Sequence, residues 1–444
     1  MELVFGTDGV RGIANIELTP ELVLSLGRAA GSVIANGHAA RVVVGTDTRI
    51  SSDMLDTALS AGLMSSGVDV LRCGVMPTPA VAALVRVLKA DAGAVVSASH
   101  NPAEYNGIKF FSSEGFKLPD EMEDRIESCV SGRGDTMRLS GPITGRSEQL
   151  YDAVELYLGH TMEAATASLH GVKLVVDCAN GAAGRVAPEL FRRMGAEVVV
   201  LNAAPDGLNI NRDCGALHPL AMQHAVLEHG AFAGMSFDGD ADRVLMSDEK
   251  GHLLDGDRMM LLAARKLQTD GQLTNDVVVG TVMSNMGFEQ ALREAGIRLV
   301  RAPVGDRYVL EEMKRFGAVL GGEQSGHVIF LSHTTTGDGL VTALQVLGAA
   351  GPDKPLSELA AGMVDYPQIL ENVRVSGRDR WNTIPEITAA VESARQKLGS
   401  DGRILIRPSG TEPLLRVMVE GRDPQLVRTI VDELSALAHR HLGG

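Results

Sequence analysis

The stretch "KLVVDCANGAAGRVAPELFRRMGAEVVVLN" (residues 173–202) contains, in order, an apolar strand, a glycine-bearing loop, an amphipathic helix, a glycine and a second apolar strand. The same pattern recurs in residues 42–74 and 276–305. Near-continuous runs of Val and Leu that alternate with helices are typical of parallel strands buried on both faces. The sequence therefore predicts three related α/β domains in tandem, each with a mainly parallel sheet.

The ends of the repeated helices carry local signals. Gly67, Gly195 and Gly296 stand where helix C-caps belong, because glycine adopts a left-handed conformation without steric cost. The N-cap chemistry of the first repeated helix is predicted to come from Ser51, Ser52 and Asp53.

The domain boundaries follow from changes in this pattern. Residues 131–147 are poor in apolar side chains and are predicted to separate the first core from the second, and a turn near residues 251–256 separates the second from the third. After Pro367 the pattern changes to a strand, a helix, a hairpin-like pair of strands and a last helix, which predicts a smaller α+β domain. The four predicted domains span residues 1–150, 151–252, 253–365 and 366–444.

The composition limits the possible partners. A net charge of −15 argues against a nucleic-acid or membrane-surface partner, because either would favour a basic face. The four cysteines are far apart and form no Cys-x-x-Cys, so neither a disulfide framework nor a zinc site is implied. Since the sequence shows no signal peptide and no apolar run of about 18 residues, we expect a cytoplasmic protein without a membrane partner.

The clearest cluster of charges is "FDGDADR" (residues 237–243). Asp238, Asp240 and Asp242 alternate, so a looping backbone can direct all three carboxylates toward one point. Hard oxygen ligands at this spacing suit Mg²⁺ or Ca²⁺. An EF-hand is disfavoured because Arg243 stands where that loop needs glycine, whereas a merely solvated acidic turn stays open as an alternative.

A second motif, "VVSASHNPAEYNGIKFF" (residues 95–111), suggests a nucleophile on a loop. Ser97 and Ser99 follow an apolar run, but the Gly-x-Ser-x-Gly elbow of a hydrolase is absent. The Asn101-Pro102 turn restricts the loop, which favours a fixed presentation of the serine.

Two further loops look suited to anions and sugars. "RPSGTEP" (residues 407–413) joins two apolar strands and offers main-chain N–H groups together with arginines, although an ordinary hairpin turn has the same residues. Its candidate phosphate ligands are Arg407, Ser409, Gly410, Thr411 and Arg416. The stretch "GGEQSGH" (residues 321–327) places Glu323, Ser325 and His327 on a glycine-flanked loop, where they are suited to bind sugar hydroxyls. The arginines in "FGTDGVRG" (5–12) and "GTDTR" (45–49) are weaker signals of the same kind.

The loops within the α/β repeats occupy the same position in each repeat. Each α/β repeat places a polar loop after an apolar strand, at the carboxyl end where such sheets bind ligands. We therefore expect four domains around a central cleft, with Ser99, the three aspartates, the pair Glu323 and Ser325, and the Arg407–Thr411 loop facing it.

The motifs "SASHNP", "DGDADR", "GGEQSGH" and "RPSGTEP", in that order, resemble the α-D-phosphohexomutase superfamily, and the resemblance runs from Phe5 to the last helix. Within it, "FGTDGVRG", "NGIKFF", "TVMSN" (281–285) and Gln324 are similar to the members that act on glucosamine phosphates. One departure is "CGALHP" (214–219), where "CGSTHP" is expected.

The resemblance implies roles for these residues. Ser99 would carry a phosphoryl group, and Asp238, Asp240 and Asp242 would hold Mg²⁺ with a phosphoserine oxygen as a further ligand. Ser97 would fix the loop. The remaining implied roles are Lys109 as the general base with His100 or His327 assisting, Arg11 and Arg243 steadying the phosphoserine and the metal loop, and Glu323 and Ser325 gripping sugar hydroxyls.

The implied reaction is the reversible isomerisation of glucosamine 6-phosphate to glucosamine 1-phosphate through a 1,6-bisphosphate. The alternatives are a phosphoglucomutase or phosphomannomutase of the same superfamily, and a Mg²⁺-dependent sugar phosphatase that uses the same aspartates. A non-catalytic sugar-phosphate sensor would not need Ser99 or the acidic loop. The resemblance also suggests a homodimer.

Overall fold

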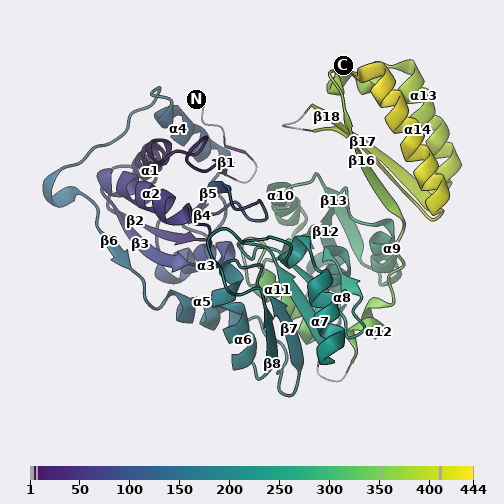
Figure 1. The fold of residues 1–444 in the computed structure, drawn as a ribbon, viewed down its shortest axis with the longest axis horizontal. Coiled ribbons are helices and arrows are strands. Elements are labelled where there is room, and N and C mark those ends of the chain that lie inside the picture. The colour runs from purple at the N-terminus through teal and green to yellow at the C-terminus, as the bar shows by residue number, and fades with distance from the viewer. Residues whose placement is uncertain (1–4, 7–8, 352–353, 410–412, 444) are drawn as a thin grey trace. The chain divides into compact units, whose positions relative to one another are not determined.

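The computed structural model describes residues 5–6, 9–351, 354–409 and 413–443 (Figure 1). By their contacts they divide into two compact units. The first unit comprises residues 1–283 and 297–361, and the second comprises residues 284–296 and 362–444.

The first sheet has the strand order β1-β5-β4-β2-β3-β6. Its strands are β1 (Val10–Ile13), β2 (Ala40–Thr46), β3 (Val68–Val75), β4 (Ala92–Val96), β5 (Tyr105–Ser112) and β6 (Ser147–Gln149). Strand β2 runs parallel to β3 and β4, β6 is parallel to β3, and β5 is antiparallel to both β4 and β1. We call one sheet with the helices that cover it a module, and number the modules in chain order. The helices of this first module are α1 (Pro20–Ala35), α2 (Ser52–Ser65), α3 (Thr78–Leu88) and α4 (Asp120–Val130).

The side chains of β2 alternate between the two faces of this sheet, which explains why helices cover both faces. Val42 and Val44 are buried in one apolar cluster with residues of α1 and α2, whereas Val43 is buried in another with residues of α3. Successive side chains of a strand point to opposite faces, so a continuous apolar run needs a cover on each side.

Two further sheets, which belong to the second and third modules, complete the first unit. The second has the order β11-β10-β9-β7-β8 and the third the order β13-β12-β14-β15. Their strands are β7 (Lys173–Asp177), β8 (Glu197–Leu201), β9 (Ala233–Phe237), β10 (Val244–Ser247), β11 (Leu253–Leu254), β12 (Val277–Thr281), β13 (Arg298–Ala302), β14 (Leu320–Gly322) and β15 (Val328–Phe330). Strands β8, β7 and β9 are parallel, as are β13, β12 and β14, and antiparallel strands extend both sheets. The helices here are α5 (Ala153–Met162), α6 (Ala187–Arg193), α7 (Leu220–His229), α8 (Gly256–Thr269), α10 (Asp306–Phe316), α11 (Gly339–Ala350) and α12 (Leu356–Ala360).

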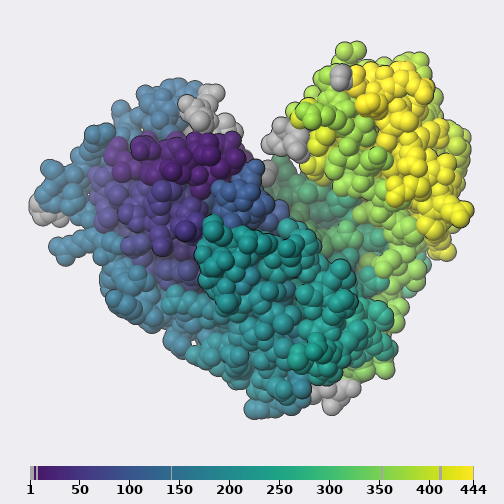
Figure 2. Space-filling view, in the orientation of Figure 1, coloured from purple at the N-terminus to yellow at the C-terminus, as the bar shows by residue number. Residues whose placement is uncertain are grey.

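One of the apolar clusters joins these modules. Buried side chains run from Val43 in the first sheet through Phe191 and Phe237 around the second sheet to Leu347 in α11. In the space-filling view the N-terminal module, in purple and blue, lies directly against the teal surface of the following residues (Figure 2). The loops of the first two modules are therefore held against each other by packing.

The three glycines predicted to end helices lie just beyond the helix ends. Gly67, Gly195 and Gly296 have φ values of 86°, 95° and 75°. The N-cap prediction is wrong in part: Ser51 is the N-cap of α2, but its side chain makes no capping hydrogen bond. Its hydroxyl instead accepts a hydrogen bond from Asn106 Nδ2 at 2.9 Å, so a contact distant in sequence replaces the local one.

Residues 131–147 pack against the first module. The Leu139 N–H donates to the Ser65 carbonyl at 3.0 Å, and the Arg146 N–H donates to Asp69 Oδ1 at 2.7 Å. The segment then continues into β6, the edge strand beside β3.

The second unit is built on an antiparallel sheet of order β16-β18-β17. Its elements are β16 (Gln368–Arg374), β17 (Gly402–Pro408), β18 (Leu414–Gly421), α13 (Pro385–Leu398), α14 (Pro424–Leu442) and α9 (Met286–Glu294). The strand, helix, hairpin and final helix match the predicted α+β domain.

Helix α9 belongs to the second unit by its contacts, although it lies within the third repeat of the sequence. Asn285 Nδ2 donates to the Tyr366 carbonyl at 2.9 Å, and the Met286 N–H donates to Glu420 Oε1 at 2.7 Å. Glu420 is fully buried and also pairs with Arg403, whose guanidinium donates to the Ser284 carbonyl at 2.7 Å. These polar contacts bind the start of α9 to the C-terminal sheet.

The predicted fold class is confirmed: the chain is mixed α/β with mainly parallel sheets and a smaller C-terminal domain on an antiparallel sheet. Among the described residues, no helix is both long and apolar enough to cross a membrane.

We predict that Asp338 makes stability depend on pH. Asp338 caps α11 and accepts a hydrogen bond from Tyr157 at 2.9 Å, and both contacts favour its charged form. Its burial outweighs them and raises the pKa of Asp338 from 3.8 to about 6. A carboxyl with a raised folded-state pKa stabilises fully below pH 3.8 and loses this contribution as the pH rises through 6. The loss amounts to about 3 kcal/mol, since one pKa unit is worth about 1.4 kcal/mol.

The measurement is thermal denaturation of the wild type and of Asp338→Asn between pH 4 and pH 7. Asparagine retains the helix cap and an acceptor for Tyr157 but does not titrate. The wild type should lose stability relative to the variant as the pH rises to about 6, with no further change above. A constant difference between the two proteins would contradict the assignment.

Candidate active site

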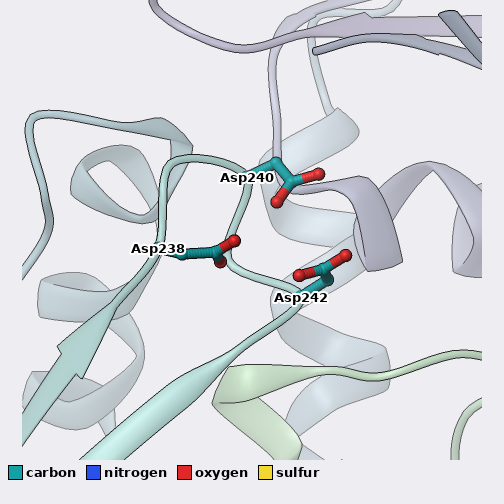
Figure 3. Close-up of side chains that lie close together, drawn as sticks. All are labelled: Asp238, Asp240 and Asp242. Carbon is teal, nitrogen blue, oxygen red and sulfur yellow. The ribbon is translucent and has the colours of Figure 1, made fainter. Parts of the chain in front are cut away.

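The acidic loop between β9 and β10 gathers the three predicted aspartates. Asp238, Asp240 and Asp242 each offer a carboxylate oxygen, and these oxygens lie within 4.8 Å of one another (Figure 3). All three side chains are buried. A tight turn brings them together: Ala241 has a φ of 58°, and its N–H donates to the Asp238 carbonyl at 3.1 Å.

The electrostatics of this loop favour a cation. Burial, together with the charges of Asp242 and Asp240, raises the pKa of Asp238 well above its ordinary value. Asp242 Oδ1 is buried and has no hydrogen-bond partner. Three hard oxygen donors that repel one another in a buried site match the preference of a small divalent cation. The residues therefore fit a metal site.

The alternative readings of the acidic loop do not fit. The loop is buried, so it is not a solvated turn. It is flanked by strands, and Glu249, at the twelfth position of a hypothetical EF-hand, accepts a hydrogen bond from the Ser357 N–H at 3.2 Å.

Ser99 reaches this loop from the first module. It follows β4 at the carboxyl end of the strand and is buried, with a left-handed φ of 50°. Its hydroxyl donates to Asp238 Oδ2 at 2.6 Å. The backbones also approach closely, since a Cβ on Gly239 would lie 2.5 Å from the Ser99 carbonyl oxygen. The structure thus brings the predicted nucleophile and the acidic loop together.

Lys109 and His100 flank this contact. Lys109 is 2% exposed, and its Nζ lies 3.1 Å from Asp240 Oδ2 and 3.4 Å from Asp242 Oδ2. His100 Nδ1 lies 3.2 Å from Ser99 Oγ. Burial, followed by the charges of Arg243 and Arg11, lowers the pKa of His100 to about 4. The imidazole is therefore neutral at pH 7.

The two predicted arginines also lie in this region. The Arg243 N–H donates to Asp238 Oδ1 at 3.2 Å, and its Nε lies 3.9 Å from Asp242 Oδ1. Burial opposes the charge of Arg243, but Asp242 and Asp238 outweigh it and raise the pKa of Arg243. Arg11 lies on β1, where it is paired with Gly107 on β5.

The "GGEQSGH" loop of the third module is tied to the acidic loop. The Val244 N–H donates to the Gly326 carbonyl at 3.2 Å, directly after Arg243. Glu323 Oε1 accepts from the Gly305 N–H at 3.0 Å, and the Ser325 hydroxyl lies 3.4 Å from Glu323 Oε2. The structure therefore places Glu323 and Ser325 together on one loop.

His327 and Gln324 of this loop point to different neighbours. His327 is buried, with its ring against Gly337 and its Nε2 3.9 Å from Asp306 Oδ2. Gln324 Nε2 donates to Asp255 Oδ2 at 3.1 Å, at the N-cap of α8.

In the second unit, Arg407 and Arg416 flank the predicted phosphate loop. They lie opposite each other on β17 and β18. Ser409 is 3% exposed, and its N–H donates to the Leu414 carbonyl at 2.9 Å. Gly410 and Thr411 lie outside the described residues.

Sequence reasoning missed several residues at the site. Thr78, at the start of α3, donates its hydroxyl to Asp240 Oδ2 at 2.6 Å. Asn211 Nδ2 donates to the Ser99 carbonyl at 2.9 Å. Asp47 and Arg49 belong to the "GTDTR" turn, where only the position of the arginine after a glycine-rich turn was a signal. Contacts across 50 or more residues leave no periodic trace in a sequence.

The comparisons with known proteins agree with one another. Models of the phosphoglucomutase/phosphomannomutase family match α/β/α domain I at residues 2–136, domain II at 155–251, domain III at 255–366 and the C-terminal domain at 370–437. A phosphoglucosamine mutase from Carboxydothermus hydrogenoformans is 53% identical over 99% of this chain and 100% of its own. One from Moorella thermoacetica is 54% identical over 99% of both chains. A crystal structure of a phosphoglucomutase/phosphomannomutase family protein from Burkholderia thailandensis superposes with a TM-score of 0.82 and 27% identity, over 98% of this chain and 97% of that one.

We predict that Gly239→Ala weakens divalent-cation binding. The new Cβ would lie 2.5 Å from the Ser99 carbonyl oxygen, so the loop between Asp238 and Asp240 must shift. Calorimetric titration with Mg²⁺ should show an affinity at least about tenfold lower, the scale on which changes around metal ligands act. The matched control is Gly159→Ala in α5, where a Cβ has no neighbour within 4 Å. Equal affinities in the two variants would contradict this account.

Proposed function

The chain belongs to the phosphoglucomutase/phosphomannomutase family, and from this premise we propose that it interconverts glucosamine 6-phosphate and glucosamine 1-phosphate. The substrate follows from full-length relatives that are named phosphoglucosamine mutase. The observation that carries the chemistry is the 2.6 Å hydrogen bond from Ser99 Oγ to Asp238 Oδ2, inside a buried cluster of carboxylates.

Asp238, Asp240 and Asp242 are the proposed ligands of Mg²⁺, and an oxygen on Ser99 is a further ligand. The family is metal-dependent, and three carboxylate oxygens suit this ion. When bound, Mg²⁺ neutralises charge on the transferring phosphoryl group.

Ser99 is the proposed carrier of the phosphoryl group. In the first transfer the bond between phosphorus and Ser99 Oγ breaks, and a bond forms from phosphorus to the free hydroxyl oxygen of the sugar, which releases its proton. The product is a 1,6-bisphosphate. After this intermediate has turned around, the bond between the other phosphorus and its sugar oxygen breaks and a bond forms from that phosphorus to Ser99 Oγ. The released sugar oxygen takes up a proton, and the isomer leaves. A phosphoserine adds about −1.5 to −2 charges at pH 7, which Arg11 and Arg243 steady.

Lys109 is the proposed general base. Its Nζ lies beside the acidic loop, 3.1 Å from Asp240 Oδ2 and 3.4 Å from Asp242 Oδ2, and the attacking sugar hydroxyl has to lose its proton at this site. His100 is neutral and contacts Ser99 Oγ, so it assists by fixing the direction of the hydroxyl.

The sugar phosphate is held by loops of two modules in this proposal. The hydroxyl groups common to both orientations of the sugar are hydrogen-bonded by Glu323, Ser325 and His327. The phosphate that does not react binds to Arg407, Ser409, Gly410, Thr411 and Arg416. The pairing of Arg407 with Arg416 supports this assignment, because two adjacent cations favour an anion between them.

The four domains that carry these loops are proposed at residues 1–150, 151–252, 253–365 and 366–444. The homodimer and the cytoplasmic location stay predictions from the sequence.

We predict that the wild type isomerises glucosamine 6-phosphate and that Ser99→Ala does not. Removal of the hydroxyl removes the acceptor of the phosphoryl group but leaves the aspartates in place. A coupled assay with glucosamine and glucose phosphates measures the activity and the sugar preference, and intact mass after incubation with the bisphosphate measures the phosphorylation of Ser99. Substantial isomerisation by Ser99→Ala would remove the serine from this role, and release of inorganic phosphate by the wild type would favour a phosphatase.

We predict that Arg407→Ala raises KM by at least about tenfold, because a charge-assisted contact to phosphate is worth about 1.5–3 kcal/mol. The matched control is Arg395→Ala on α13, an exposed arginine whose Nη1 lies 3.9 Å from Glu392 Oε2. Steady-state kinetics of both variants decide the question. An unchanged KM in Arg407→Ala would refute the phosphate loop.

A further inference from the structure

We infer that Arg49 is a positioning residue for the transfer, which fixes residues 97–105, here called the Ser99 loop, so that Ser99 Oγ faces the acidic loop. This inference rests on the proposed function and extends it to a residue whose guanidinium donates to Asp47 and to carbonyl groups of the Ser99 loop.

Arg49 is placed under the Ser99 loop by the sheet itself. Strands β2 and β4 are parallel neighbours with Thr46 paired to Val96, so the residues that follow each strand lie side by side. The Asp47 N–H donates to the Val96 carbonyl at 3.1 Å. The turn after β2 therefore supports the loop after β4.

The guanidinium of Arg49 uses all five of its N–H donors. Its Nε donates to Asp47 Oδ2 at 2.8 Å. Nη2 donates to the Ser99 carbonyl at 3.0 Å and the Asn101 carbonyl at 2.8 Å, and Nη1 donates to the carbonyls of Tyr105, at 3.0 Å, and Pro102. The side chain is fully buried. One rigid, planar group thus binds four carbonyl groups of the Ser99 loop.

Asp47 extends the same network to the amide of Ser99. Its Oδ2 accepts a hydrogen bond from Ser97 Oγ at 2.7 Å, and Ser97 Oγ accepts from the Ser99 N–H at 3.0 Å. The N–H and the carbonyl of Ser99 are therefore both held by the pair of Asp47 and Arg49, one through Ser97 and the other directly.

The hydrogen bonds of Arg49 and Asp47 hold Ser99 in a strained backbone conformation. Ser99 has a φ of 50°, a conformation that a residue with a side chain adopts at a cost and keeps only when its surroundings hold it. Asn211 shares the Ser99 carbonyl with Arg49. Without the arginine, four carbonyl groups of the Ser99 loop lose a donor, and Ser99 Oγ can turn away from Asp238.

The turn that carries Arg49 is also anchored to the second module. Thr48 Oγ1 donates to the Asn180 carbonyl at 2.6 Å, and the Ile50 N–H donates to the Gly207 carbonyl at 2.9 Å. Arg49 therefore connects the Ser99 loop to a turn that is itself hydrogen-bonded to the second module, which carries the acidic loop.

The test compares Arg49→Lys with Arg72→Lys. Lysine retains the charge beside Asp47 but has three donors at one point, so it cannot bind four carbonyls. Arg72 is the matched control, because its guanidinium also pairs with a buried aspartate of the first module, and that partner is Asp56 on α2 instead of a residue of the Ser99 loop. We expect kcat of Arg49→Lys to fall by about 10²-fold, the scale of a small misplacement of a reacting group, while KM is unchanged.

Hydrogen exchange gives a readout independent of activity. Peptides that cover residues 97–105 should exchange faster in Arg49→Lys, whereas those residues in Arg72→Lys should match the wild type. If Arg49→Lys fails to fold, Ser97→Ala replaces it, since this variant removes only the link between Asp47 and the Ser99 N–H. It should lower kcat in the same direction and speed exchange in the same peptides.

The outcomes separate the inference from the proposed function. A wild type without isomerase activity would overturn the proposed function, whatever the loop does. Exchange of residues 97–105 that is unchanged in the folded Arg49→Lys, or in Ser97→Ala when that variant replaces it, would overturn the inference. So would a loss of kcat that is equal in Arg49→Lys and Arg72→Lys.

Discussion

Three carboxylates buried within 4.8 Å of one another are the constraint on which the rest of the site depends. Such a cluster is unfavourable by itself, because each charge is desolvated and repelled by the other two. The surroundings compensate with the Lys109 ammonium, the Thr78 hydroxyl and the Ser99 hydroxyl, each of which comes from the first module and contacts a carboxylate of the second. The acidic loop therefore binds the two modules together as well as preparing a place for a cation.

This arrangement explains how a strongly acidic chain can act on an anionic substrate. The net charge of −15 repels phosphate at a distance, so the positive groups must be local. Arg11 and Arg243 lie near Ser99, since both lower the pKa of His100 after the effect of its burial. In the second unit, Arg407 and Arg416 form a separate basic pair on adjacent strands. Each place where the proposed mechanism needs a phosphate has its own arginines.

The repeated strand–loop–helix pattern was sufficient to predict the fold class, because burial on both faces leaves a strong signal in β2, β7 and β12. The alternation of Asp238, Asp240 and Asp242 likewise predicted that the three carboxylates point toward one place. Spacing could not show that Ser51 would bind Asn106 instead of capping α2, that Thr78 would bind Asp240, or that Arg49 would bind four carbonyls. These contacts depend on which loops meet after folding, and no local preference encodes them.

The attachment of α9 to the C-terminal sheet has a consequence for how the chain can be divided into fragments. Glu420 is buried with the Met286 N–H and Arg403 as partners, so a fragment that starts at β16 would leave its carboxylate short of a donor. The second unit is thus formed by two separate stretches of the chain. A fragment designed to fold as this unit has to include residues 284–296 together with residues 362–444.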